Sequence, residues 1–243
     1  MMQHTQILPG VEIHGLTLYV RKEKVLIFGD LHLGYEEELI SSGFLVPRTQ
    51  YKKLIAHLKH VLAGIDVSTV VINGDLKHEF GRISEQEWKE VVCFLDFLSE
   101  KVKKIILVKG NHDTIMGPIA SRKEIITAPY FFLEKSGIYV THGHVIPEDA
   151  DIKKAKVIII GHDHPAVSLR EGARTEKVKC FLKGKWNKKI LVQMPSASFM
   201  TEGTDVTNER PLSPFMHQPL WDFVAYCVEG FEVLYFGELG EVP

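Results

Sequence analysis

The first half of the chain alternates short apolar runs with longer amphipathic stretches, and this pattern predicts strands and helices in turn. An apolar stripe over 51–62 predicts a helix that ends near Gly64. A second helix is expected to begin at the capping box Ser84-Glu85-Gln86-Glu87. Buried strands are expected at 16–20, 24–28, 69–72 and 104–108.

The second half of the chain reads mostly as strands. These are expected at 137–140, 157–160, 167–169, 190–192, 223–228 and 231–236. The last two flank Glu229-Gly230, which is typical of a tight hairpin turn. Strand–helix–strand units of this length predict parallel pairing and an α/β fold. In such folds ligands bind beyond the carboxyl ends of the strands.

The composition argues against some classes of protein but does not indicate a particular function. The 243 residues are 45% hydrophobic and 25% charged, as in an ordinary soluble globular protein. A net charge of -2 argues against tight nonspecific nucleic-acid binding, although a local basic patch stays open. We expect a cytoplasmic protein, because the sequence has no secretory signal and no apolar run of about 20 residues. The three cysteines, Cys93, Cys180 and Cys227, are expected to be buried and reduced.

Polar clusters directly follow five of the apolar runs. They are Asp30-Leu31-His32, Gly74-Asp75, Gly110-Asn111-His112-Asp113, Thr141-His142-Gly143-His144 and Gly161-His162-Asp163-His164. Asp-x-His and Gly-Asp are common alone, but an unpaired polar side chain beside a buried strand is costly, so a shared partner such as a metal explains all five. One carboxylate can bridge two ions. Ligation by nitrogen and oxygen without thiolate favours Mn²⁺, Fe or Zn²⁺ over Ca²⁺ or copper.

The order of these motifs, from Asp30 to His164, resembles the calcineurin-like metallophosphoesterase superfamily. The resemblance implies a four-layer α/β/β/α (α+β) sandwich of two mixed sheets flanked by helices. It implies one domain over 1–243, with a motif core at 24–165 and a mostly β part at 166–243. It also implies hydrolysis of a phosphodiester by a hydroxide that bridges two divalent ions. Mn²⁺ is the first choice of metal, with Fe, Zn²⁺ or Ni²⁺ as alternatives.

The same resemblance implies a role for each matching residue. One metal would be held by Asp30, His32, Asp75 and His164, and the other by Asp75, Asn111, His142 and His162. His112 would face the phosphate as a catalytic residue. Asp113 would orient the His112 ring or, alternatively, cap a following helix.

Narrower resemblances concern three segments. Those at 30–35 and 74–78 resemble the SbcD-type repair nucleases, in which a histidine at the position of His78 lies near the scissile phosphate. The alternative for His78 is a surface histidine beside Glu79. The segment 194–206 resembles small archaeal and helicase- or ligase-associated phosphoesterases, which implies a DNA-repair helicase or ligase as a protein partner. The chain shows no capping domain or coiled-coil-binding tail, which argues against a processive nuclease with an ATPase partner.

Several alternatives remain open at this level. The leading substrate is a small or nucleotide-like phosphodiester, and a DNA or RNA nuclease is the alternative. A phosphomonoesterase and an inactive metal-binding scaffold rank lower. Six lysines over 177–189 could contact nucleic-acid phosphates, but the pattern favours a solvated β-hairpin with lysines along its edge. The sequence sets neither the oligomeric state nor a role for His144, His217 and the irregular segment 195–219, which could wall the substrate pocket.

Overall fold

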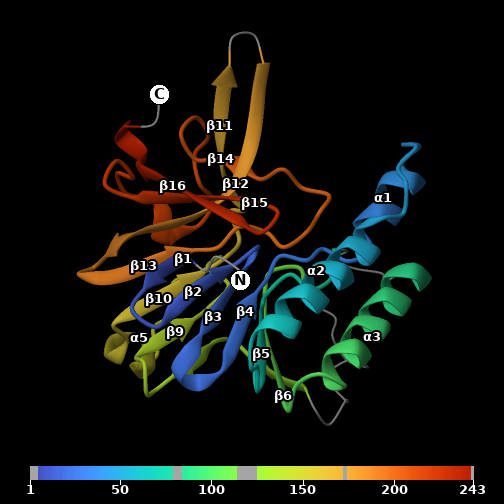
Figure 1. Ribbon diagram of the computed structural model, residues 1–243, viewed down its shortest axis with the longest axis horizontal. Helices are drawn as coiled ribbons and strands as arrows, with labels where there is room; N and C mark the ends of the chain where they lie inside the picture. The colour runs from blue at the N-terminus through green and yellow to red at the C-terminus, as the bar shows by residue number, and fades with distance from the viewer. Residues whose placement is uncertain (1–4, 79–83, 114–124, 172–173, 242–243) are drawn as a thin grey trace.

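Two mixed β-sheets pack face to face in this computed structural model, which describes residues 5–78, 84–113, 125–171 and 174–241 (Figure 1). The first sheet has the spatial order β1 (Thr5–Leu8), β2 (Val11–His14), β3 (Thr17–Val20), β4 (Val25–Phe28), β5 (Thr69–Asn73), β6 (Lys104–Val108) and β7 (Ile125–Ala128). Strands β1 to β4 pair antiparallel, whereas β4 to β7 pair in parallel. The carboxyl ends of β4, β5 and β6 therefore lie side by side, at the edge of the sheet where these strands end.

The second sheet combines strands from the middle and the end of the chain. Its order is β14 (Thr204–Asp205), β11 (Pro165–Glu171), β12 (Arg174–Trp186), β13 (Lys189–Gln193), β10 (Val157–Ile160), β9 (Ile138–Val140) and β8 (Phe131–Leu133). Strand β15 (Val224–Glu229) pairs with β12, and β16 (Glu232–Glu238) pairs with β15. Because β9 and β10 run in parallel, the loops after them also leave from one edge.

Helices cover the outer faces, so the expected four-layer sandwich is confirmed. The described residues form the helices α1 (Tyr35–Ser41), α2 (Gln50–Gly64), α3 (Glu85–Ser99) and α5 (Ala150–Lys154), with single 3₁₀ turns η1 (Arg21–Glu23), η2 (Pro214–Met216) and η3 (Leu239–Glu241). Apolar residues of α2 and α3 join the core of the first sheet, and Ile152 of α5 packs with the second. The outer layer over the second sheet is thin, because α5 has only five residues.

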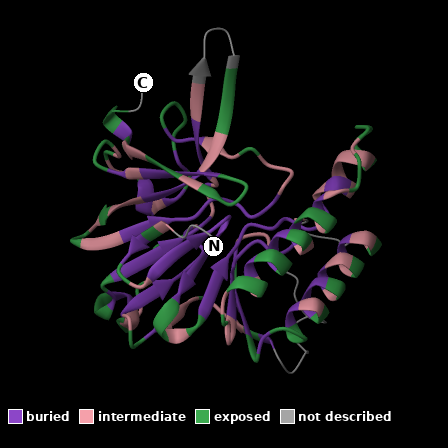
Figure 2. Cartoon of the chain, viewed as in Figure 1, coloured by how far each residue is buried: buried purple, intermediate pink, exposed green. Residues whose placement is uncertain are grey.

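The sequence of strand β10 is apolar throughout because both of its faces are covered. Val157 and Ile159 belong to the core shared between the sheets, whereas Ile158 and Ile160 belong to the core on the side of α5. Alternate side chains point to opposite faces of a strand, and both faces of this one are covered, so no polar position interrupts the run. Figure 2 shows the same burial along the central strands of both sheets.

The predicted strands and helices are present, and the start of α3 differs in one detail. The Ser84 hydroxyl accepts the N–H of Glu87 at 3.1 Å, as a capping box requires. The Glu87 carboxylate, however, accepts the backbone N–H of His78 at 2.8 Å. The helix start is thereby tied to the loop after β5. The sequence pattern missed β1, β2, β7, β8, β14, α1 and α5, which are too short for a periodic pattern to show.

The lysine-rich segment is a β-hairpin, as expected, but the interpretation that its lysines guard a sheet edge is wrong. Asn187 and Lys188 form its turn with φ of 46° and 66°, the conformation that a two-residue hairpin needs. Strand β12 lies inside the sheet, paired with β11, β13 and β15. Some lysines of the hairpin bind within the molecule: Lys183 of β12 donates to the Tyr226 hydroxyl at 2.9 Å, and Lys189 of β13 donates to the Lys153 carbonyl oxygen at 2.9 Å.

Two of the three cysteines are buried, as expected. Cys180 and Cys227 lie opposite each other on β12 and β15, and both are free thiols. Cys93 is exposed on α3, contrary to the expectation, because it falls on the solvent side of the apolar stripe. No helix in the described part of the chain combines the length and apolar character that crossing a membrane requires.

His57 is a buried titratable group on α2. Its ring stacks on Phe231 with centroids 4.7 Å apart, and its Nε2 accepts the N–H of Leu16 at 3.3 Å. Burial, assisted by the nearby His60 and Lys179, lowers the pKa of His57 to about 4. The folded protein therefore keeps this ring neutral at pH values where the unfolded chain protonates it.

The free energy of unfolding should therefore fall as the pH drops from about 6.5 towards 4, since the unfolded state binds the extra proton. We expect His57→Gln, which retains an acceptor for Leu16, to remove roughly 2 kcal/mol of the difference in stability between pH 7 and pH 4.5. Urea unfolding at both pH values measures this difference. His60→Gln, on the exposed side of the same helix, is the control and should change it far less, because burial and not His60 is the main cause of the lowered pKa. An unaltered pH dependence in His57→Gln would contradict the assignment.

Candidate metal centre

The structure brings all seven sequence-predicted ligands together at the meeting edges of the two sheets. Asp30 and His32 follow β4, Asp75 follows β5, Asn111 follows β6, His142 follows β9, and His162 and His164 follow β10. The two sheets touch through His142, whose Nδ1 lies 3.1 Å from the carbonyl oxygen of Asn73. Each side chain leaves its strand where parallel pairing ends, so the convergence follows from the topology.

The backbone is strained at these residues. Among the described residues, eight that are not glycine have positive φ, and five of these are predicted ligands: Asp30, His32, Asp75, His162 and His164. A left-handed conformation costs a non-glycine residue on the order of 1–2 kcal/mol and persists only where surrounding contacts hold it. Here the N–H of Asp30 donates to the Gly74 carbonyl at 2.9 Å, and that of His32 donates to the Asp75 carbonyl at 3.0 Å.

One group of side chains consists of Asp30, His32 and His164, whose ligand atoms all lie within 4.8 Å of one another. Nε2 of His164 is 3.4 Å from Oδ1 of Asp30. Nε2 of His164 is also 3.3 Å from Nε2 of His32. Two imidazole nitrogens and a carboxylate oxygen thus point at one small volume.

A second group consists of Asp75, His142 and His162, again within 4.8 Å. Nε2 of His142 lies 3.4 Å from Oδ2 of Asp75 and 3.0 Å from the amide oxygen of Asn111. The same Oδ2 of Asp75 is 3.9 Å from Nε2 of His32 in the first group. Asp75 therefore lies between the two groups, where a bridging ligand would be needed.

The electrostatics reflect two carboxylates buried among imidazoles. Asp30 is 0% exposed and Asp75 is 2% exposed. Burial would raise both pKa values, but His164 and His142 lower that of Asp30, and His142 lowers that of Asp75. Burial lowers the pKa of His142, yet Asp75 and Asp30 together raise it to about 9. Burial, with His164, lowers the pKa of His32 to about 3, which keeps that ring neutral.

These donor sets fit divalent transition-metal ions. Each group offers a carboxylate and neutral or neutralisable imidazoles, and Asn111 adds an amide oxygen. No thiol belongs to either group, because the described cysteines lie in α3, β12 and β15. Nitrogen and oxygen donors at this spacing suit Mn²⁺, Fe or Zn²⁺. A cation between the carboxylates would compensate their buried charge.

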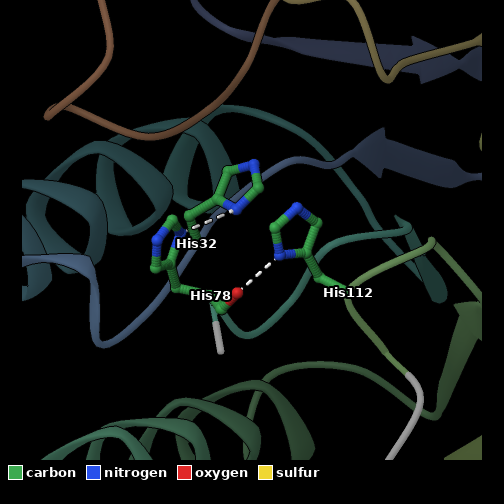
Figure 3. Close-up of side chains that lie close together, drawn as sticks. All are labelled: His32, His78 and His112. Atoms are coloured by element: carbon green, nitrogen blue, oxygen red, sulfur yellow. Dashed lines mark hydrogen bonds between the residues drawn. The ribbon is translucent and has the colours of Figure 1, made fainter. Parts of the chain in front are cut away.

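His112 and His78 lie beside the first group (Figure 3). The Nδ1 of His112 contacts the carbonyl oxygen of His78, so its Nε2 is turned towards Asp75, 3.9 Å from Oδ2. The Nδ1 of His78 lies 3.3 Å from the Nδ1 of His32. The His78 side chain is 19% exposed, and Glu79, its neighbour in the alternative surface interpretation, lies outside the described residues.

The carboxylate of Asp113 binds backbone groups of two loops, and its expected role in orienting the His112 ring stays a prediction. One oxygen of its carboxylate accepts the N–H groups of Asp75 and Gly110 at 2.8 and 3.0 Å, and the other accepts that of Leu76 at 3.1 Å. Asp113 thus ties the loop after β6 to the loop after β5. Its alternative role as the cap of a following helix concerns residues 114–124, which lie outside the described part of the chain.

Two buried polar residues that sequence reasoning missed, Ser196 and Gln50, support the Asp30–His32 loop, and the partly buried Lys179 supports the segment that carries Ser196. The Ser196 hydroxyl donates to the Asp30 carbonyl oxygen at 2.6 Å. Gln50 donates to the Leu31 carbonyl oxygen at 2.6 Å. The Lys179 ammonium donates to the carbonyl oxygens of Ser196 and Ser198, and burial lowers its pKa to about 8. Of these residues, only Ser196 lies in a segment, 194–206, that the sequence analysis had singled out for its resemblance to other phosphoesterases.

The irregular segment 195–219 packs against the ligand loops. The N–H groups of Leu212 and Ser213 donate to Asp163 at 2.7 and 2.9 Å, and Asp163 stands between two predicted ligands. His217 contacts the Pro211 carbonyl oxygen through Nε2 at 3.2 Å, so this contact of its ring is made within the segment itself. The ring of His144 lies 5.2 Å from that of His142, between centroids, and burial, with His142, lowers its pKa to about 4.

Comparison with known proteins gives a family and a fold. The family profile for calcineurin-like phosphoesterases matches residues 23–166. The search of curated proteins gives no match. A solved nuclease, MPE from Pseudomonas putida, superposes with a TM-score of 0.66 at 18% identity and covers 96% of this chain and 99% of its own. A Vps29 mutant from Entamoeba histolytica superposes with a TM-score of 0.37 at 17% identity, over 88% of this chain and 99% of its own.

The contacts of Asp113 predict a structural effect. Asp113→Asn would place an amide NH₂ or a single oxygen against three backbone donors, so we expect a loss of about 1–3 kcal/mol in the free energy of unfolding. Metal affinity should weaken as well, because Asp75 is one of the three donors. Denaturant unfolding and metal titration measure the two effects. Full stability with only a shifted pH–rate profile would instead support the role of Asp113 in orienting His112.

Proposed function

The chain belongs to the calcineurin-like phosphoesterase family, and on this premise we propose that it is a dinuclear metal-dependent phosphodiesterase. The observation that carries the proposal is the pair of His/Asp groups, each with its ligand atoms within 4.8 Å, and the position of Asp75, a member of the second group whose Oδ2 is 3.9 Å from Nε2 of His32 in the first. A protein that held one structural ion would need only one such group. Two adjacent groups that share a carboxylate are typical of centres that hydrolyse phosphate esters.

The proposed ligand sets are those that the motif order implies. Asp30, His32, Asp75 and His164 hold one ion, and Asp75, Asn111, His142 and His162 hold the other. Mn²⁺ is the proposed metal. Such a pair supplies an activated water at neutral pH and stabilises the charge that develops on the phosphoryl oxygens.

His112 is the proposed general acid. With Nδ1–H donated to the His78 carbonyl oxygen, the ring presents Nε2 towards the metal centre. A proton on that nitrogen can pass to the leaving oxygen as the phosphorus–oxygen bond breaks. The carbonyl contact keeps the ring in this orientation and stabilises its cationic form, since Nδ1–H is a donor in imidazolium.

The proposed substrate is a small or nucleotide-like phosphodiester. The motifs at 30–35 and 74–78, which include His78, support placement near the SbcD-like branch. A DNA or RNA nuclease is the second candidate, and the likeness in fold to the Pseudomonas putida nuclease over nearly the whole chain favours it. A DNA-repair helicase or ligase would be the matching protein partner.

Removal of metal tests the proposal directly. We expect the Mn²⁺-loaded protein to hydrolyse bis-p-nitrophenyl phosphate faster than the monoester and to lose this activity with chelator. Asp75→Asn should weaken both ions, because Asp75 is the proposed ligand of both, whereas Asn111→Ala should weaken mainly one. Calorimetric titration of Mn²⁺ resolves the two sites. Activity that persists in the metal-free protein would falsify the proposal, and two undiminished sites in Asp75→Asn would remove its bridging role.

The role of His112 predicts a dependence on the leaving group. An alkoxide needs a proton in order to leave, whereas p-nitrophenolate largely does not. His112→Ala should therefore lower the rate on a nucleotide diester by roughly 10²–10⁴-fold and the rate on bis-p-nitrophenyl phosphate by less. Metal content, measured in parallel, should stay at the parent value. Equal losses on both substrates would assign His112 to charge stabilisation, and loss of an ion would place it among the ligands.

A further inference from the structure

His78 stands between a predicted metal ligand and a carboxylate to which no role has been assigned. Its Nδ1 lies 3.3 Å from the Nδ1 of His32, as Figure 3 shows. Its Nε2 lies against Oε2 of Glu38, and that oxygen is buried although the Glu38 side chain as a whole is 43% exposed. The three side chains thus form a row that leads from the metal centre to the first helix.

The proton positions in this row depend on one another. Nε2 of His32 faces the ligand cluster, 3.3 Å from Nε2 of His164 and 3.9 Å from Oδ2 of Asp75. If that nitrogen gives its lone pair to a metal, the proton of neutral His32 must be on Nδ1. An Nδ1–H of His32 then donates to Nδ1 of His78, which places the His78 proton on Nε2, facing the carboxylate.

We propose that Glu38, acting through His78, is a positioning residue that holds His32 in the tautomer and orientation required for metal binding. The inference rests on the proposed function, because it takes His32 to be a ligand. A metal-bound histidine usually donates its second N–H to an acceptor, and a carboxylate at the end of such a chain increases the basicity of the ligand. The acceptor here is a second histidine, and Glu38 stands behind it.

The surroundings of His78 fix its ring for this purpose. The Tyr35 ring lies over it, with centroids 4.2 Å apart and an interplanar angle of 34°. The backbone N–H of His78 donates to the Leu33 carbonyl oxygen at 3.0 Å and to the Glu87 carboxylate at 2.8 Å. Tyr35 and Glu38 belong to α1, which begins three residues after His32, so the same short segment carries the ligand and its support.

A different use of the same residues is a third metal site. His32, His78 and His112 also have ligand atoms within 4.8 Å of one another. An ion there would need the lone pair of His32 Nδ1 or would have to rely on His78 and His112 alone. It would displace the proton on which the row depends, so the two arrangements exclude each other and give different metal stoichiometries.

The neighbouring residue provides a matched control. Glu37 lies on the same helix, but its carboxylate pairs with Arg48. We expect Glu38→Ala to weaken one of two ions by roughly 10-fold in calorimetric titration of the metal-free full chain with Zn²⁺, since loss of such outer partners costs 10–100-fold. Glu38→Gln, which keeps an acceptor but no charge, should fall between parent and Glu38→Ala. Glu37→Ala should match the parent.

A spectroscopic measurement tests the tautomers themselves. In nitrogen-15 NMR of the Zn²⁺-loaded parent, His32 should carry its proton on Nδ1 and His78 on Nε2. Undiminished affinity in Glu38→Ala, or a His78 proton on Nδ1, would overturn the inference and leave the proposed function intact. A third Zn²⁺ that His78→Ala loses would overturn it in favour of the three-histidine site. Failure of the proposed function appears separately, as a parent protein that binds fewer than two ions, and it removes the inference as well.

Discussion

The need to neutralise two buried carboxylates organises this molecule. Asp30 and Asp75 are almost completely withdrawn from solvent at the junction of the sheets. An isolated carboxylate in such a place would be strongly destabilising, so the charge has to be met by hydrogen bonds, by cationic imidazole or by metal ions. In the metal-free protein His142 takes this part, because the two carboxylates raise its pKa to about 9. A divalent ion in each group would provide the same compensation and release the imidazole as a neutral ligand.

This arrangement requires backbone geometry that the ligand residues do not favour by themselves. Five predicted ligands have left-handed φ, and each loop is held by hydrogen bonds from another part of the chain. Asp113 joins the loops after β5 and β6, whereas Ser196 and Gln50 hold the loop after β4. The segment 195–219 is therefore part of the support of the site. Buried polar networks of this kind stabilise one arrangement, provided that every member has its partner.

The two-sheet architecture explains why one centre can draw on so much of the sequence. Strands β4 to β6 bring Asp30, Asp75 and Asn111 to one edge, and β9 and β10 bring the distant histidines to the facing edge. Neither sheet carries a full set of ligands. Packing between the sheets, through residues such as Val140, Ile159 and Phe181, therefore also fixes the relative position of the ligand groups. Stability and site geometry depend on the same core.

The sequence by itself determined the fold class, the main strands and helices, and the residues that meet at the site. These features are local: an apolar run of four or five residues forms a strand, and a polar cluster directly after it lies at the carboxyl end. The positions of the predicted ligands followed from this rule without knowledge of distances. The parallel order of β4 to β6 did as well, because the strand–helix–strand spacing permits little else.

Only the tertiary structure decided which side chains support the ligands. Glu38 lies in an acidic run that is typical of a solvated helix face, yet it contacts His78, 40 residues later in the sequence. Lys179 lies in a lysine-rich hairpin, yet it donates to the carbonyl oxygen of Ser196. Asp113 was expected to serve its neighbour His112, and the structure shows that it binds the backbone of Asp75 and Leu76. Short strands such as β7 and β8 exist through pairing alone. Contacts between residues far apart in the chain have no periodic pattern, so their partners are chosen when the sheets and loops pack.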